Sequence, residues 1–238
     1  MPRLYVLIGL ALILARPLSA ADWTPIGLSG GGAMFGPAIS PADPGRLLVH
    51  CDMSGVYRSA DAGRTWTLIH ADQLQASTQC RPAFHPHRAD VAYSPHSWSD
   101  RLRVTRDGGL TWSELGALGG LPVGEIGVVA GEPDRLLVGV GEAVSCSRDG
   151  GITWQRCAGP RGRVIGYHFA ASAWWVATGE GIWASSDEGA TWQERTGGLP
   201  GRGLRGFSGG TRDGRTLLYC TLPCRVEGGR LAVAGRAG

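Results

Sequence analysis

Short apolar stretches alternate with glycine-rich segments along most of the chain. Examples are residues 46–52 (RLLVHCD), 135–140 (RLLVGV) and 174–178 (WWVAT). Each stretch is too short for a helix and is rich in residues that favour strands. The composition agrees, because 39 glycines, 9 tryptophans and a charged fraction of 18% are typical of turn-rich β structure. The pattern therefore predicts an all-β protein.

The first residues form a different pattern. Arg3 precedes a continuous apolar run at residues 4–14, and Arg16 is followed by a proline and small residues. This arrangement is typical of a secretory signal, and the run is too short to span a bilayer. We expect a signal peptide at residues 1–21, a mature chain at residues 22–238, and a secreted or periplasmic location. The alternative is an uncleaved N-terminal anchor, which is the only membrane association that we expect.

The charge argues against a nucleic-acid partner. The formal net charge is +3, and Arg3 and Arg16 belong to the predicted signal, so the mature chain is nearly neutral. A nucleic-acid surface needs a clear basic excess. The sequence also lacks a phosphate-binding loop, a dinucleotide fingerprint and a Ser/His/Asp elbow, and we expect no cofactor.

Six cysteines form an even set, as expected for disulfides in an exported chain. Cys146 and Cys157 flank one predicted hairpin, so we expect a disulfide between them. Cys220 and Cys224 have the spacing of zinc ligands but lack a second Cys or His pair nearby, and residues 85–87 (HPH) lack a third ligand. We therefore expect no metal site and assign residues 85–87 to a turn.

An eight-residue pattern, Ser/Thr-x-Asp-x-Gly-x-Thr-Trp, occurs four times. Successive tryptophans lie 46, 42 and 38 residues apart, and such a period predicts a repeat architecture. The four copies are Ser59, Asp61, Gly63, Thr65 and Trp66; Thr105, Asp107, Gly109, Thr111 and Trp112; Ser147, Asp149, Gly151, Thr153 and Trp154; and Ser185, Asp187, Gly189, Thr191 and Trp192.

The residue types of the pattern are those of a hairpin turn. The Asp carboxylate can accept hydrogen bonds from backbone N–H groups, and Gly permits a positive φ. Thr and Trp begin the returning strand, and we expect the indole to pack between neighbouring sheets. We therefore assign the four aspartates a structural role; the alternative is a catalytic or calcium-binding role.

Each repeat is long enough for four short strands, which is one blade of a β-propeller. For the first blade we predict strands A to D at Ala33–Ser40, Arg46–Asp52, Val56–Ser59 and Thr65–His70. Blades are expected at residues 30–70, 78–116, 123–158 and 163–196, with a partial blade at 203–224 and an N-terminal strand at 22–28.

The eight-residue pattern resembles the Asp-box, or bacterial neuraminidase, repeat, and this resemblance spans nearly the whole mature chain. It implies a β-propeller. No fifth box follows, because Leu204–Ser208 and Thr216–Leu222 supply only strands A and B of a further blade. Either the strand at 22–28 completes a five-bladed ring, or the chain is the front part of a longer propeller. We favour the second, because the Gly/Ala/Arg-rich last residues resemble no propeller strand.

Strand order fixes where a ligand pocket is expected. With strand A innermost, the boxes lie on the face of the A–B and C–D turns, and we expect a central pocket on the opposite face, built from B–C and D–A loops. Carboxylates can serve as acid and base on a sugar, and aromatic rings stack on pyranoses; the alternative is an ordinary solvated loop rim. The candidate binding residues are His70, Asp72, His96, Trp98, Asp100, Glu142 and Glu180.

Two segments, residues 30–33 (GGGA) and 52–58 (DMSGVYR), resemble the first blade of the family 74 glycoside hydrolases, the xyloglucanases. The corresponding aspartate of that family is the catalytic base of an inverting endo-glucanase, a role that the resemblance assigns to Asp52. Ser54 replaces a glycine of the family, and the catalytic acid of the family lies on a second propeller. An inverting mechanism needs both carboxylates, about 6.5–9.5 Å apart. We therefore expect this chain alone to bind a glycan without turnover.

Sialidases share the Asp boxes, but their Arg-Ile-Pro segment does not occur in this chain. Three hypotheses follow. The first is a secreted propeller that acts, or whose ancestors acted, on glycans as glycoside hydrolases, and we favour it. The second is a non-catalytic scaffold for a protein or polysaccharide, similar to sortilin-type and photosystem II assembly-factor propellers. The third is a truncated product without a function of its own.

Overall fold

The computed structural model describes residues 32–76, 80–97, 100–120, 123–199 and 201–222. The predicted signal peptide, the predicted strand at 22–28, Trp98 and Cys224 lie outside these residues. Within the described part the regular elements are strands. The same part contains no helix of the length and apolarity needed to cross a membrane.

Four antiparallel sheets of four strands follow one another, each with its strands in chain order, and a two-stranded sheet follows them. The first two sheets contain β1 (Met34–Ile39), β2 (Leu47–Cys51), β3 (Gly55–Ser59), β4 (Thr67–Leu68), β5 (Ala83–Phe84), β6 (Ala92–Pro95), β7 (Arg101–Thr105) and β8 (Ser113–Ala117). The others contain β9 (Val123–Val129), β10 (Arg135–Val140), β11 (Ala143–Ser147), β12 (Gln155–Arg161), β13 (Val164–Ala170), β14 (Ala173–Thr178), β15 (Ile182–Ser185), β16 (Gln193–Glu194), β17 (Gly206–Arg212) and β18 (Arg215–Thr221). The predicted all-β class with four-stranded antiparallel sheets is confirmed.

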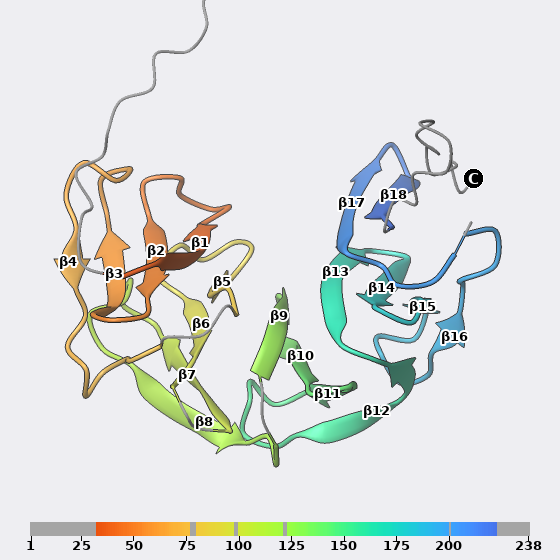
Figure 1. The fold of residues 1–238 in the computed structure, drawn as a ribbon, viewed down its shortest axis with the longest axis horizontal. Coiled ribbons are helices and arrows are strands. Elements are labelled where there is room, and N and C mark those ends of the chain that lie inside the picture. Colours follow the sequence, from red (N-terminus) through yellow and green to blue (C-terminus); the bar gives the residue numbers. More distant parts are fainter. Residues whose placement is uncertain (1–31, 77–79, 98–99, 121–122, 200, 223–238) are drawn as a thin grey trace, which may run out of the picture.

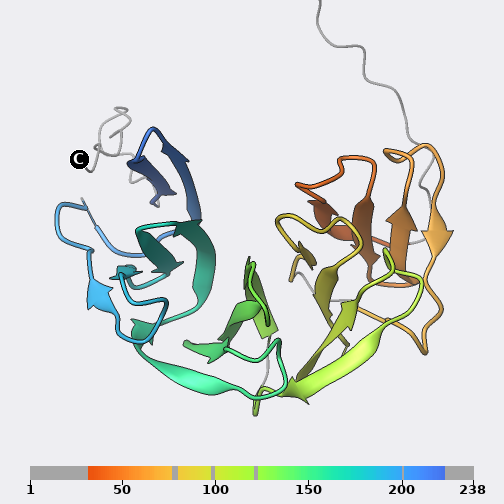
Figure 2. The same cartoon turned by 180° about the vertical axis from the view of Figure 1, so that it is seen from behind.

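The sheets are arranged as blades along an arc (Figure 1). Strands β1, β5, β9, β13 and β17 line the inner side of the arc, and neighbouring inner strands contact one another. The last strands of the four complete sheets lie on the outer side. From behind, the first and last sheets again form the two separate ends of the arc (Figure 2). A closed ring and the full number of blades stay predictions.

Hydrophobic side chains fill the space between neighbouring sheets. Trp112, from the second box, is buried and packs with Leu48 of the first sheet. Trp154, from the third box, packs against the second sheet, and its Nε1 donates a hydrogen bond to the carbonyl of Gly116 on β8 at 3.0 Å. Trp192 packs in the same way against the third sheet. Each of these tryptophans therefore joins its own sheet to the preceding one.

Each box is closed by the same hydrogen bonds, which the third box illustrates. The Ser147 hydroxyl accepts a buried bond from the amide of Gly151 at 2.8 Å and donates to Asp149 at 2.8 Å. Asp149 accepts exposed bonds from the amide of Thr153 at 2.9 Å and from its hydroxyl at 2.5 Å. The equivalent bonds form in the other three boxes. The aspartate accepts a backbone amide of its turn, as expected, and the buried amide of the box glycine is satisfied by the Ser or Thr hydroxyl.

The box aspartates stay ionised over a wide pH range. Hydrogen bonds from the side chain and amide of Thr153 lower the pKa of Asp149 to about 2. The pKa values of Asp61 and Asp187 are lowered to about 2 by the corresponding threonines. An ionised carboxylate whose oxygens are occupied by donors of its own turn fits a structural role.

The boxes also determine where the outermost strands start. We predicted strand D of the first blade at Thr65–His70, but β4 covers only Thr67–Leu68. The reason is that the amide and hydroxyl of Thr65 are bound to Asp61 and do not join the ladder of the sheet. The last strand of the fourth sheet, β16, is short in the same way.

Asp134 connects the second and third sheets. It lies in the β9–β10 turn, and its side chain is only 4% exposed. It accepts a hydrogen bond from the Tyr93 hydroxyl at 2.8 Å and pairs with Arg88 at 2.5 Å and with Nε2 of His85 at 3.2 Å. Nδ1 of His85 accepts hydrogen bonds from the amides of His87 and Arg88. The ring proton is therefore on Nε2, which donates to Asp134. The HPH segment, expected only to turn the chain, thus also bridges two blades.

We expect Ser147→Ala to lower the free energy of unfolding by about 1–3 kcal/mol, because the buried amide of Gly151 loses its acceptor. Asp149→Ala should lower it less, since the bonds that this change removes are exposed to water. Urea denaturation followed by tryptophan fluorescence measures both values. A larger loss in Asp149→Ala than in Ser147→Ala would contradict this assignment.

Asp134→Ala should lower the free energy of unfolding by about 2–5 kcal/mol, because the buried Tyr93 hydroxyl and His85 Nε2–H each lose their acceptor, at about 1–3 kcal/mol per group. The matched control is Asp213→Asn, which removes an exposed negative charge beside Arg212, keeps a side chain suited to the positive φ of this turn, and should change stability very little. Denaturation curves of the two variants provide the test. Equal stabilities would show that Asp134 does not hold the sheets together.

Candidate functional site at the inner mouth

The face opposite the boxes contains the turns that join the second and third strands of each sheet and the loops between sheets. We call the part of this face where the inner strands begin the inner mouth; it includes Arg81, Glu125, Arg163 and Arg205. Each of these residues lies at or just before the start of β5, β9, β13 or β17. Chain geometry therefore brings four charged residues from four successive sheets to one region.

Asp52 lies in the β2–β3 turn on this face. Its side chain is exposed, and its Oδ1 accepts a hydrogen bond from the amide of Ala33, just before β1, at 2.8 Å. A Cβ at Gly32 would lie 2.2 Å from this carboxylate oxygen, and Gly32 has a φ of +112°. The glycine-rich segment before β1 therefore allows the carboxylate to approach the inner strand. The catalytic role of Asp52 stays a prediction.

Four other candidate residues lie in loops of the first two sheets. His70 and Asp72 are exposed beside each other after β4, with a nitrogen–oxygen distance of 3.5 Å. His96 accepts a bond from the amide of Gln75 at 3.4 Å, and burial lowers its pKa. The Asp100 carboxylate accepts a hydrogen bond from the amide of Gly119 at 3.1 Å. These contacts hold loops of the second sheet in place and do not gather the four side chains into one cavity.

The candidates Glu142 and Glu180 lie in the β10–β11 and β14–β15 turns, and both are exposed. Gly162 lies between them: its amide donates to the carbonyl of Glu142 at 3.0 Å, and a Cβ there would lie 2.9 Å from Cγ of Glu180. The two turns are therefore neighbours, as expected from their equivalent places in adjacent blades. Their roles in ligand binding stay predictions.

A cavity of about 400 Å³ opens at the inner mouth between the third, fourth and fifth sheets. Its charged lining residues are Glu125, Arg163 and Arg205, and the rest of its wall comes from Val164, Ile165, Gly179, Gly203 and Leu204. Among the described residues, none of the binding residues expected from the sequence lines this cavity, although Glu180 directly follows Gly179. Its wall comes from the starts of inner strands, the loops before them and the β14–β15 turn, and its carboxylate is Glu125.

Glu125 has an unusual environment for a carboxylate. Burial raises its pKa, while the nearby guanidinium groups of Arg81 and Arg163 act in the opposite direction. The neighbouring Cys80 thiol donates a hydrogen bond to the carbonyl of Gly124 at 2.6 Å, and its burial raises the pKa of the thiol. The thiol is therefore protonated at neutral pH, and Glu125 is held in its charged form less firmly than an exposed carboxylate because burial raises its pKa.

A sequence signal for this cavity exists. Glu125 interrupts the apolar stretch at residues 123–129 (VGEIGVV), and a charge inside an inner strand is costly unless something faces it. The residues expected to bind a ligand all lie in turns and loops, whereas Glu125 lies within an inner strand. The described residues contain no group of three or more His, Cys, Asp or Glu placed to hold a metal ion.

Known proteins agree with this architecture. The family model for the BNR/Asp-box repeat matches residues 145–156, which include the whole third box. An ancestral GH74 enzyme superposes with a TM-score of 0.63 over 85% of this chain at 17% identity. The chain therefore contains a BNR/Asp-box repeat and has a β-propeller-like fold. No curated protein sequence matches it.

Two further solved structures are also similar to this chain. The GH74 xyloglucanase from Xanthomonas campestris has a TM-score of 0.59 over 84% of this chain at 21% identity. YCF48 from Cyanidioschyzon merolae has a TM-score of 0.57 over 91% of this chain at 16% identity, and another YCF48 structure contains a D1 peptide. The chain spans 29% and 35% of the two GH74 proteins and 74% of the YCF48 chain. At these identities the likeness shows the fold alone.

The BNR-repeat protein also brings together the two cysteines of the third hairpin. Cys146 on β11 and Cys157 on β12 are free thiols whose side chains are hydrogen-bonded to each other. This bond lowers the pKa of Cys146 and raises that of Cys157. A thiol with a lowered pKa next to a second thiol is suited to disulfide formation.

We therefore expect oxidised glutathione to convert this pair to a disulfide. The Cys146 thiolate attacks the glutathione disulfide, one glutathione leaves, and Cys157 then displaces the second. Peptide mapping without reduction should recover residues 146 and 157 in one cross-linked peptide. A map in which both remain separately alkylated after oxidation would rule out the pairing. Cys157→Ser is the control and should retain one glutathione on Cys146.

Proposed function

We propose that the BNR-repeat protein is a glycan-binding propeller that engages an acidic saccharide at the inner mouth and does not cleave it alone. The observation that supports this proposal is the set of arginines around Glu125. Arg81, Arg163 and Arg205 are exposed and come from three different sheets, and Arg163 and Arg205 line the cavity together with a single carboxylate, Glu125. The mouth is therefore cationic.

Arginine is suited to such a ligand. A guanidinium group presents donors in a planar fork that matches a carboxylate with two parallel hydrogen bonds. The uronic acids of acidic polysaccharides supply a carboxylate on every sugar, so neighbouring arginines can each bind one residue of the ligand. The cavity of about 400 Å³ is within the usual range for small-molecule sites.

Hydrolysis needs more than the inner mouth offers. An inverting glycosidase places two carboxylates about 6.5–9.5 Å apart on either side of the bond that it cleaves. In the family 74 resemblance the acid belongs to a second propeller, and this chain spans 29% of the ancestral GH74 enzyme. Asp52 is therefore proposed as a catalytic base only for a longer form of the protein. For this chain we propose secretion or export, binding and no turnover.

A non-catalytic protein scaffold is the second candidate. The cationic mouth also fits an acidic peptide, and one structural neighbour, YCF48, is bound to a D1 peptide. Acidic saccharide and acidic peptide share the carboxylate chemistry. They differ in that only the peptide has a backbone that can pair with strands.

Titration calorimetry of the whole chain with trigalacturonic acid, and separately with a tetraglutamate peptide, tests the proposal. We expect saturable binding of trigalacturonic acid, about tenfold weaker in Arg163→Ala because one charge-assisted bidentate contact is lost. Arg64→Ala, an exposed arginine in the turn of the first box, is the control and should bind normally. Binding of the peptide alone would favour the scaffold, and binding of neither would refute both.

The pH dependence should identify Glu125. Because burial raises the pKa of Glu125, this carboxyl group protonates earlier than an ordinary one as the pH is lowered from 7, and protonation removes the negative charge beside the arginines. Affinity for trigalacturonic acid should then rise about three- to tenfold. Glu125→Gln should bind more tightly at pH 7 and show little change over this pH range. A Gln variant with an unchanged pH profile would exclude Glu125 as the titrating group.

A further inference from the structure

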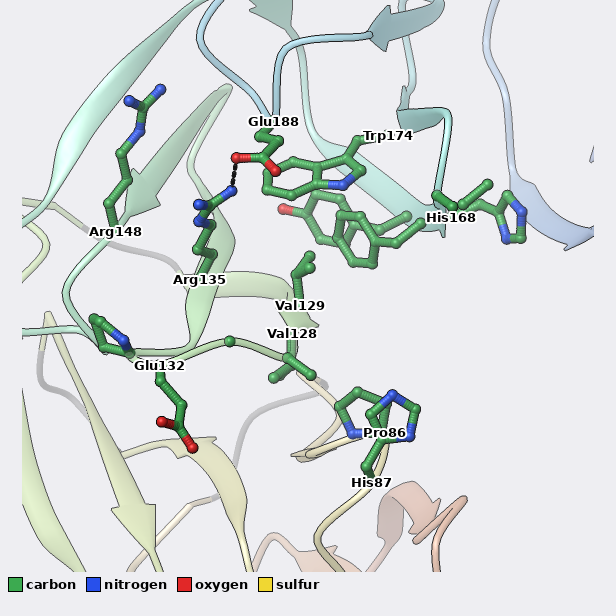
Figure 3. Close-up of a pocket in the computed structure, with 17 residues that line it drawn as sticks. Pro86, His87, Val128, Val129, Glu132, Arg135, Arg148, His168, Trp174 and Glu188 are labelled. Carbon is green, nitrogen blue, oxygen red and sulfur yellow. Dashed lines mark hydrogen bonds and ion pairs between the residues drawn. The ribbon is translucent and has the colours of Figure 1, made fainter.

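A second cavity lies on the opposite face of the arc, where the Asp boxes are. Its volume is about 690 Å³. One wall comes from the end of β9 and the β9–β10 turn, and another comes from β13 and β14. Arg148 of the third box and Glu188 of the fourth box lie at its edge (Figure 3). We call it the box-face pocket.

This pocket is separate from the inner mouth. Glu125 of the mouth and Val129 of the box-face pocket lie near opposite ends of the same strand, β9. Four residues of a strand span about 13 Å. A ligand in one cavity therefore leaves the groups of the other free, and the pocket is independent of the function proposed above.

Three aromatic side chains form one side of the pocket. Tyr167 and Phe169 of β13 are stacked with ring centres 5.8 Å apart, and Phe169 meets Trp174 of β14 edge-on at 5.6 Å. Tyr167 and Phe169 lie against Gly127 of β9, where a Cβ would lie 2.7 Å from the Phe169 ring. The missing side chain at Gly127 thus makes room for the cluster, which also forms part of the pocket wall.

The charged groups of the pocket balance one another. Arg135 forms an ion pair with Glu188 across the boundary between the third and fourth sheets (Figure 3). Arg148 and Glu132 also line the cavity, so two positive and two negative groups leave no net formal charge. Unlike the inner mouth, this pocket has no electrostatic preference for an anion.

Aromatic rings together with balanced guanidinium and carboxylate groups match a neutral polyhydroxylated ligand. Trp174 is only 8% exposed and Tyr167 and Phe169 are half-buried, so the exposed parts of Tyr167 and Phe169 offer apolar surface to a pyranose, and the charged groups donate to and accept from its hydroxyls. The volume is within the range of about 300–1,000 Å³ that is usual for ligand sites. We infer that the box-face pocket binds a short neutral oligosaccharide.

The test uses the whole chain and three uncharged probes, cellotetraose, xylotetraose and mannotetraose, with quenching or shift of tryptophan fluorescence and calorimetry as readouts. At least one probe should bind saturably. Arg148→Ala and the double variant Arg135→Gln with Glu188→Gln should each weaken that binding at least fivefold, while trigalacturonic acid binding stays unchanged. Melting temperatures of the variants show whether they are folded.

The control is Arg163→Ala at the inner mouth, which should bind the neutral probe as well as the unchanged protein does. The inference is overturned if none of the three probes binds, or if the box-face variants bind the neutral probe normally. It is also overturned if Arg163→Ala, and not Arg148→Ala, abolishes binding, because the neutral sugar would then occupy the inner mouth.

Discussion

The bond between a Ser or Thr hydroxyl and the amide of a box glycine is the constraint on which each blade depends. This amide is buried beneath the turn and has no partner in the strand ladder. The hydroxyl of Ser147, for example, satisfies Gly151 and also orients Asp149, which in turn holds the start of the returning strand. Because the turn direction is fixed, the tryptophan that follows, such as Trp154, packs against the preceding sheet. Local turn chemistry thereby sets the packing of the blades.

This dependence explains what could be predicted from the sequence. The box hairpins and the order of four strands follow from contacts within a few residues, so the repeat pattern was enough to place strands such as β3 and β15. The length of β4 could not be predicted from apolarity, because a competing bond from Thr65 to Asp61 decides where the ladder starts. Hydrophobic pattern alone does not indicate that competition.

The inner mouth was missed for a different reason. Glu125, Arg163 and Arg205 lie some 40 residues apart along the chain, and only the arrangement of successive blades brings them to one cavity. The sequence indicated which face to search but not which strand positions point there. The box-face pocket was not predicted because the sequence assigns only hairpin turns to that face, and the pocket is formed by residues of two different sheets. Both cavities lie between blades, and the residues of a turn do not indicate which side chains of neighbouring blades come together.

The carboxylate of Asp134 has a consequence for how the arc comes apart. Repeat arrays unfold according to the strength of the junctions between neighbouring units. A buried network joins the second and third blades, whereas the ion pair between the third and fourth blades, Arg135 with Glu188, is partly exposed. The third and fourth blades are also joined by apolar packing that includes Leu137, Val164 and Trp174, so the two junctions should respond differently to salt and pH. A ligand in the box-face pocket would contact both the third and the fourth blade and thereby strengthen the junction between them.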